Sequence, residues 1–272
     1  MEKIQAAIAK ARASRQTQAE TDGPPLPSRA APADETAVTR AWAALDEVQL
    51  DPAALAEHHV ITLTGGPAVA PFDTLRTRVL QQLRGQGWRR LALTSPGPGC
   101  GKSTLSLNLA FSLARQSNLR IVLAELDLRR PSLARLLGLD RSHSFAHVLD
   151  GRSTFAENAV RCGANLAIAT NRGPSRAPSE LLQGPGVAGI LAGIEADYAP
   201  DVMLFDLPPL LVNDDAMAFL GQSDCAILVA ASEVTTLVEI DQCEREIASH
   251  TNVMGVVLNK CRYGEKDYGY GY

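Results

Sequence analysis

Short runs of consecutive hydrophobic residues alternate with helical patterns from about residue 60 onward. The runs cover residues 89–95, 120–126, 165–170, 201–207, 225–231 and 253–259. Because each run is continuously apolar rather than alternating, we expect strands that are buried on both faces. Residues 105–116, LSLNLAFSLARQ, have the spacing of an intervening helix. The pattern predicts an α/β fold in which helices cover both faces of a mostly parallel sheet.

The first 59 residues have a different texture. Residues 1–16 combine apolar positions at helical spacing with a cluster of cations: Ile4, Ile8 and Ala11, and Lys3, Lys10, Arg12 and Arg15. The segment is either a short amphipathic helix that docks on a partner or an anionic membrane, or a solvated leader. Residues 17–36, rich in proline, alanine and small polar residues, are typical of a linker, and residues 36–48 are weakly helical. We therefore expect an extension (1–59), a P-loop NTPase-like domain (60–262) and a flexible tail (263–272).

Composition narrows the possible partners and the compartment. The net charge of −4 gives no basic field for nucleic acid, and the five cysteines form no CxxC pair that would indicate zinc or a disulfide framework. The N-terminal residues lack the apolar core of a signal peptide, and no apolar run is long enough to cross a membrane. These features favour a cytoplasmic protein, with membrane contact only through a partner or residues 1–16.

Tyrosine is distributed unevenly along the chain. Of five tyrosines, four lie in the last ten residues: Tyr263, Tyr268, Tyr270 and Tyr272. Tyrosine is normally spread through cores and interfaces. The cluster is therefore either a binding strip for a partner or a substrate.

A glycine-rich sequence, residues 94–110, follows a predicted strand and opens a predicted helix. This is the context of a phosphate-binding loop, in which backbone amides and the helix dipole face the anion. We expect its glycines to adopt positive φ, Lys102 to reach the β- and γ-phosphates and Ser103 to place its hydroxyl on Mg²⁺. The strict pattern fails only at Pro96, where a glycine is usual. The expected nucleotide-binding residues are Gly97, Gly99, Cys100, Gly101, Lys102, Ser103 and Thr104.

Three carboxylates close predicted strands. Glu125 and Asp127 lie two residues apart, so on an extended strand end they would point the same way, and Asp206 ends the strand at 201–207. Ligands of open α/β sheets bind at the carboxyl ends of the strands. The sequence therefore predicts that all three meet beside the glycine-rich loop, where they can hold Mg²⁺ directly or through water.

The order of these segments resembles that of the deviant-Walker ATPases, and within them the bacterial tyrosine autokinases of capsule and exopolysaccharide loci. The similar segments are GCGKST, ELDLRRPSL, RAPSELL, FDLPP, NDDA and GVVLNK, within residues 68–272. The resemblance implies ATP and Mg²⁺ as cofactors, with Lys102 and Ser103 on the phosphates and Mg²⁺. It implies Asp127 and Asp206 as Mg²⁺ ligands, Glu125 as the base that accepts the tyrosine proton, and Asn259 near adenine. The four tail tyrosines would be the phosphate acceptors, and the active site of a neighbouring subunit would phosphorylate them.

The chain departs from the family pattern at three places. Glu125 stands where the family has aspartate, and the Glu-x-x-Arg-x-x-Arg pattern of the family's oligomerisation helix reads Ala70, Asp73 and Arg76. Gly97 stands where septum-site and plasmid-partitioning ATPases have an additional lysine, which favours the kinase branch.

Three functions remain open from the sequence. The first is an ATP-dependent tyrosine autokinase that controls polysaccharide polymerisation or export, recruited to the inner membrane by a separate polysaccharide co-polymerase. The second is a partitioning-type ATPase switch, and the third is an ATP-binding regulator without catalysis. The tyrosine-rich tail and the missing lysine favour the first.

Overall fold

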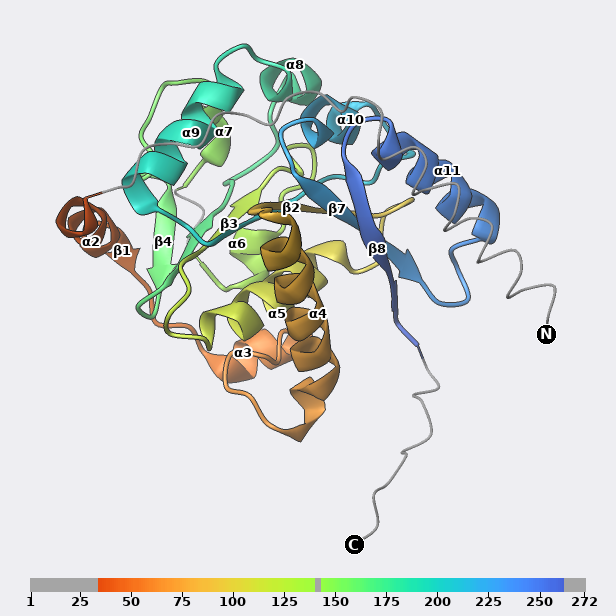
Figure 1. The fold of residues 1–272 in the computed structure, drawn as a ribbon, viewed down its shortest axis with the longest axis horizontal. Helices are drawn as coiled ribbons and strands as arrows, with labels where there is room; N and C mark the ends of the chain where they lie inside the picture. The colour runs from red at the N-terminus through yellow and green to blue at the C-terminus, as the bar shows by residue number, and fades with distance from the viewer. Residues whose placement is uncertain (1–33, 140–142, 262–272) are drawn as a thin grey trace, which may run out of the picture.

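The computed structural model describes residues 34–139 and 143–261 (Figure 1). Its strands are β1 (Asp46–Glu47), β2 (Arg90–Thr94), β3 (Ile121–Glu125), β4 (Ala159–Cys162), β5 (Leu166–Ala169), β6 (Val202–Asp206), β7 (Cys225–Ala231) and β8 (Asn252–Asn259). The longer helices are α2 (Glu35–Ala43), α4 (Ala70–Gln86), α5 (Lys102–Ala114), α9 (Val187–Tyr198) and α11 (Leu237–Ala248). The shorter ones are α3 (Pro52–Glu57), the 3₁₀ turn η1 (Pro67–Val69), α6 (Leu133–Leu136), α7 (Phe145–Leu149), α8 (Pro178–Leu182) and α10 (Asp215–Leu220).

The strands form one eight-stranded sheet in the order β1-β4-β5-β3-β6-β2-β7-β8. All pairs are parallel except β4 with β5. The six predicted strands are confirmed as β2, β3, β5, β6, β7 and β8. The predicted fold class, a mostly parallel sheet in a P-loop NTPase-like arrangement, is confirmed.

Helices cover both faces of the sheet. Figure 1 shows α7 to α11 on one side and α3 to α6 on the other. Each face has its own buried apolar cluster: Phe205 and Phe219 belong to one, and Leu107 and Leu123 to the other. Burial on both sides explains why the central strands are continuously apolar in sequence.

The structured part of the described chain begins before the predicted boundary at residue 60. Trp42 of α2 and Leu55 of α3 are buried in the two clusters, and β1 pairs with β4. The indole Nε1 of Trp42 donates to the carbonyl of Tyr198 at 2.8 Å. Residues 34–59 thus pack on the domain instead of belonging to an extension. The predicted N-terminal helix, most of the linker and the tail tyrosines lie outside the described residues.

Two further observations concern composition. None of the described helices is both long and apolar enough to span a membrane. All five cysteines are described, and all are free.

Candidate active site

The glycine-rich loop connects β2 to α5. Gly99 and Gly101 adopt left-handed φ values of 78° and 88°. Gly97 does not, so the expectation of positive φ is confirmed for two of the three glycines and wrong for Gly97. A Cβ on Gly101 would lie 2.4 Å from Nδ2 of Asn259, so this position also needs glycine for space. The loop therefore has the backbone that allows close approach to phosphates.

Lys102 opens α5 and points toward the carboxylates. Its Nζ donates to Oδ2 of Asp127 at 2.8 Å, and both side chains are buried. Burial lowers the pKa of Lys102, but the carboxylates around it outweigh burial and raise that pKa above its usual value. Lys102 is therefore charged, and its counter-ion in this structure is Asp127.

Asp206 ends β6 and is completely buried. Its Oδ1 accepts a hydrogen bond from the Ser106 hydroxyl at 3.0 Å, whereas Oδ2 has no hydrogen-bond partner among the described residues. Burial raises the pKa of Asp206, and the nearby Lys102 opposes that rise. Oδ2 of Asp206 is buried without a partner in the described chain and lies near the start of α5, which carries the Ser103 hydroxyl. A hydrated cation would supply the missing partner, so these residues fit Mg²⁺. In the described part of the chain, no three His, Cys, Asp or Glu side chains form a metal site alone, so phosphate oxygens and water would complete it.

Glu125 does not point the way the sequence predicts. Its Oε1 accepts from the backbone N–H groups of Ser132 and Leu133, and its Oε2 accepts from the N–H of Asn171 at 2.8 Å. Burial raises the pKa of Glu125 to about 7, and these backbone hydrogen bonds oppose the rise. The expectation that Glu125 and Asp127 share an orientation is wrong, because β3 ends at Glu125 and strand alternation ends with it.

A cavity of about 360 Å³ opens over the loop. Predicted residues that line it are Gly99, Gly101, Lys102, Ser103, Thr104 and Asp127. The other predicted residues, Gly97, Cys100, Glu125, Asp206 and Asn259, are not among its lining. Most of the predicted phosphate contacts are thus brought together. Glu125 does not line the cavity, but its charge is close enough to raise the pKa of Lys102.

Arginines that the sequence left unassigned lie around the same cavity. Arg130 and Arg135 line it, and neither side chain forms an ion pair with a described residue. Arg129 lines it too, but its guanidinium binds both oxygens of the buried Asp215, with Nε to Oδ2 at 2.5 Å. Ser179 of α8 donates to the same carboxylate. Residues 129–132 (RRPS) and 213–216 (NDDA) are therefore in contact. The sequence contains both segments but does not show that they touch.

Asn259 ends β8 on the other side of the loop. Its Nδ2 donates to the carbonyl of Cys100 at 2.9 Å. The Cys100 thiol lies 3.9 Å from the hydroxyl of Thr235. In this structure Asn259 holds the loop to the sheet, and a contact with adenine stays a prediction.

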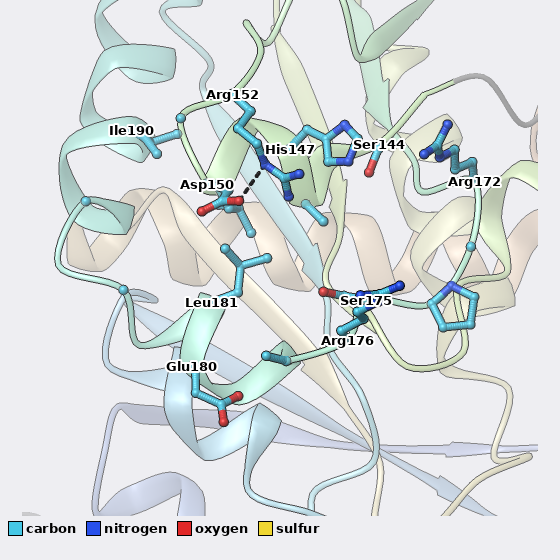
Figure 2. Close-up of a pocket in the computed structure, with 18 of the residues that line it drawn as sticks. Ser144, His147, Asp150, Arg152, Arg172, Ser175, Arg176, Glu180, Leu181 and Ile190 are labelled. Carbon is cyan, nitrogen blue, oxygen red and sulfur yellow. Dashed lines mark ion pairs between the residues drawn. The ribbon is translucent and has the colours of Figure 1, made fainter.

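A second, larger cavity of about 750 Å³ lies between α7, α8 and α9 (Figure 2). Figure 2 shows Arg152 paired with Asp150, at 2.5 Å, and His147 and Arg172 nearby. None of the predicted site residues lines this cavity. It lacks the glycine-rich loop and the buried Lys102, so the smaller cavity is the candidate nucleotide site.

The aligned oligomerisation residues make contacts within the chain. Oδ1 of Asp73 accepts from Nη1 of Arg76 at 3.1 Å and from the Ser112 hydroxyl at 3.0 Å, and it also pairs with Arg115. Asp73 thus joins α4 to α5.

Comparison with known proteins identifies the family of this chain. The family model described as the CobQ/CobB/MinD/ParA nucleotide binding domain matches residues 91–268. The match spans more than half of the chain and starts in β2, just before the glycine-rich loop. This chain belongs to that family.

Within the family, the chain is similar to bacterial tyrosine-protein kinases. It is 28% identical to tyrosine-protein kinase YwqD of Bacillus subtilis, over 73% of this chain and 84% of that protein. It is 30% identical to tyrosine-protein kinase wzc of Salmonella typhimurium, over 75% of this chain and 28% of that protein. The solved kinase domain of Escherichia coli tyrosine kinase ETK has a TM-score of 0.65 at 25% identity, covering 75% of this chain and 80% of that one. The chain spans about 27% of the length of other curated relatives it matches.

Proposed function

We propose that this protein is an ATP-dependent protein-tyrosine kinase that phosphorylates its own tail tyrosines. The observation that carries the proposal is the buried pair of Lys102, on the glycine-rich loop, with Asp127, beside Arg130 and Arg135, which form no ion pair with a described residue. The similarity to proteins named tyrosine-protein kinases supports the same reaction class. The acceptors would be Tyr263, Tyr268, Tyr270 and Tyr272, which lie outside the described residues.

In the proposed reaction, a tyrosine hydroxyl oxygen attacks the γ-phosphorus of ATP. A new oxygen–phosphorus bond forms, the bond between the γ-phosphorus and the bridging oxygen breaks, and ADP leaves. Lys102, Arg130 and Arg135 bind the phosphate oxygens and stabilise the charge that builds up on them. Ser103, Asp127 and Asp206 would hold Mg²⁺, which neutralises phosphate charge when bound.

The tyrosine proton needs an acceptor, and we propose Glu125 for that role. Its pKa of about 7 suits a general base at neutral pH. To act, its carboxylate must exchange the backbone partners of Ser132, Leu133 and Asn171 for the hydroxyl. The base is active when ionised, so phosphorylation is expected to rise about tenfold per pH unit below pH 7 and to level off above it.

Glu125→Gln tests the base. Lost phosphorylation with unchanged ATP affinity supports it, whereas retained phosphorylation would mean that Glu125 only positions residues 126–133. A wild type that itself lacks phosphotransfer would instead make an ATP-binding regulator the better candidate. The buried orientation of Glu125 is the observation that favours this second candidate.

The main experiment is incubation of the full chain with ATP and Mg²⁺, followed by phosphotyrosine mapping by mass spectrometry. Lys102→Ala is expected to remove the signal, and Arg84→Ala, which changes an exposed cation on α4, is the matched control. Replacing the four tail tyrosines with phenylalanine should also remove it, whereas Tyr198→Phe in the core should not. A Lys102→Ala protein with undiminished phosphotyrosine would refute the kinase.

We further propose a cytoplasmic protein that is recruited to the inner membrane by a polysaccharide co-polymerase and regulates exopolysaccharide or capsule polymerisation and export. Self-association through the active site and tail would be weakened by phosphorylation, since each phosphate adds about −1.5 to −2 charges. Size-exclusion profiles of the phosphorylated protein and of the tail tyrosine-to-phenylalanine variant should therefore differ. Identical profiles would remove this regulatory step.

A further inference from the structure

One apolar surface is left without a partner in the described chain. Most of the large apolar side chains that are exposed come from two neighbouring segments, the start of α11 and the end of β8: Val234, Leu237, Val238, Val256 and Leu258. We call these five residues the α11–β8 patch. Leu237 is 79% exposed and Val238 73%, values that are unusual for side chains of this size in adjacent positions.

The two segments form one surface. Ser232, in the loop before α11, donates its N–H to the carbonyl of Asn259 at 2.8 Å. Val256 of β8 pairs with Leu228 of β7, which belongs to the apolar cluster on the α11 side of the sheet. Because cross-strand partners share a face and side chains alternate, Val256 and Leu258 lie on the same side as α11. Figure 1 shows α11 and β8 side by side at one edge of the sheet.

The α11 side of the patch is acidic, whereas the exposed Lys260 follows its β8 side. Residues 233–246 contain five carboxylates and a single cation: Glu233, Glu239, Asp241, Glu244 and Glu246, and Arg245. An occupant must therefore combine an apolar stripe with positive charge. The segment 1–16 has that composition, with Ile4, Ile8 and Ala11 on one helical face and Lys3, Lys10 and Arg12 beside it, while Arg15 follows on the same face.

The chain between the two is long enough. Residues 17–34 can span up to about 59 Å when extended. The eight strands put about 34 Å between the outer strands of the sheet. The eight residues of β8 are about 26 Å long, so the diagonal of the sheet is roughly 43 Å. The N-terminal segment can therefore reach the patch from α2 within one molecule.

We propose that residues 1–16 fold as a basic amphipathic helix against the α11–β8 patch of the same molecule. The patch adjoins the glycine-rich loop, since Thr235 contacts Cys100 and Asn259 holds the Cys100 carbonyl. The docked helix would lie beside the nucleotide site and cover the apolar side chains at the open edge of the sheet. This inference does not depend on the kinase proposal.

Hydrogen exchange measured by mass spectrometry on the full chain tests the docking. In the wild type, amides of residues 4–12 and 234–240 are expected to be protected together. Ile4→Asp with Ile8→Asp should abolish that protection in both segments, because it places charge on the apolar stripe. Ala6→Asp with Ala13→Asp makes the same charge change on the opposite helical face and should leave the protection intact.

The reciprocal variant is Leu237→Asp with Val238→Asp. Both side chains are exposed and acidic residues suit a first helical turn, so the domain is expected to fold. Residues 4–12 should then lose their protection. Fast exchange of residues 4–12 in the wild type would overturn the proposal, even if anionic vesicles later protect them. Protection that disappears on dilution would also overturn it, since the occupant would then be a second copy.

Discussion

Gly101 meets two requirements at one position. Its φ of 88° lies in the left-handed region, and a Cβ there would lie 2.4 Å from the amide nitrogen of Asn259. Any side chain at position 101 would therefore either strain the backbone or displace Asn259. Since Asn259 holds the Cys100 carbonyl, the displacement would reach the loop that lines the cavity.

We predict that Gly101→Ala weakens nucleotide binding by roughly tenfold, because left-handed strain costs about 1–2 kcal/mol. Gly97→Ala is the matched control in the same loop, since a Cβ there meets nothing within 4 Å and its φ is not left-handed. Titration of a fluorescent ATP analogue measures both variants. Equal affinities for the two would contradict the role given to Gly101.

The residues of the loop could be predicted because strand, glycines, lysine and hydroxyls occur in one short segment. The direction of Glu125 could not be predicted. Whether a carboxylate two residues before Asp127 shares its orientation depends on where the strand ends, and β3 ends at Glu125 itself. Arg135 was missed as well, because a lone arginine on a short helix carries no signal until the fold brings it to the cavity.

At the scale of elements, the sequence indicated the helical character of α2 but placed this helix outside the domain. Its composition resembles that of the linker before it, and only Val38 and Trp42 on this helix are buried. Trp42 packs edge-on against Tyr198 with ring centroids 6.1 Å apart and donates to that residue's carbonyl. This one side chain fixes α2 to α9.

We predict that Trp42→Ala lowers the free energy of unfolding by about 3–5 kcal/mol, the usual cost of removing a large buried aromatic side chain. Thr39→Ala on the exposed side of the same helix is expected to stay within about 0.5 kcal/mol of the wild type. Urea denaturation followed by circular dichroism gives both values. A small effect of Trp42→Ala would mean that α2 contributes little to the domain.

The contacts of Asp73 lead to a second prediction about how the helices pack. It joins α4 to α5 by accepting hydrogen bonds from Arg76 and Ser112 and pairing with Arg115. Asp73→Ala should lower the free energy of unfolding by about 1–3 kcal/mol, since it leaves polar partners unsatisfied. Arg78→Ala, one turn along and exposed, is the control. Size-exclusion chromatography should give the same oligomeric state for wild type and variant if Asp73 acts only within the chain.

The strands were predictable to different degrees for a physical reason. Central strands are covered on both faces, so their sequences are continuously apolar. The edge elements carry weaker signals: β1 has two acidic residues, and β4 has four residues that include Arg161. Pairing with neighbours places such segments in the sheet, and pairing leaves little mark on local sequence.

At the scale of the whole molecule, the site joins segments from three strand ends. Lys102 follows β2, Asp127 follows β3 and Asp206 ends β6, and these strands are adjacent in the order β3-β6-β2. Parallel strands bring their carboxyl ends to one edge, so the sheet itself assembles the site. That convergence could be predicted from the sequence, whereas the pairing of Lys102 with Asp127 could not.

The pairing predicts how two ligands affect each other. In the proposed site, phosphate would bind Lys102 and Mg²⁺ would bind Asp127, so each ligand would take one member of the pair away from the other. ATP should therefore bind at least about fivefold more tightly with Mg²⁺ than with EDTA. Asp127→Asn should shrink that ratio and Asp46→Asn, exposed on β1, should not. Titration calorimetry at matched ionic strength supplies the affinities.

Lys102 and Asp127 thus stand in for both ligands within the chain. A cation and an anion that belong to the chain neutralise each other at the position where an external anion and cation would bind. Thermodynamic reciprocity then requires ATP to tighten Mg²⁺ binding by the factor with which Mg²⁺ tightens ATP binding. The occupancy of the site would follow the product of the two free concentrations, and the protein would respond to the metal-bound nucleotide as one species.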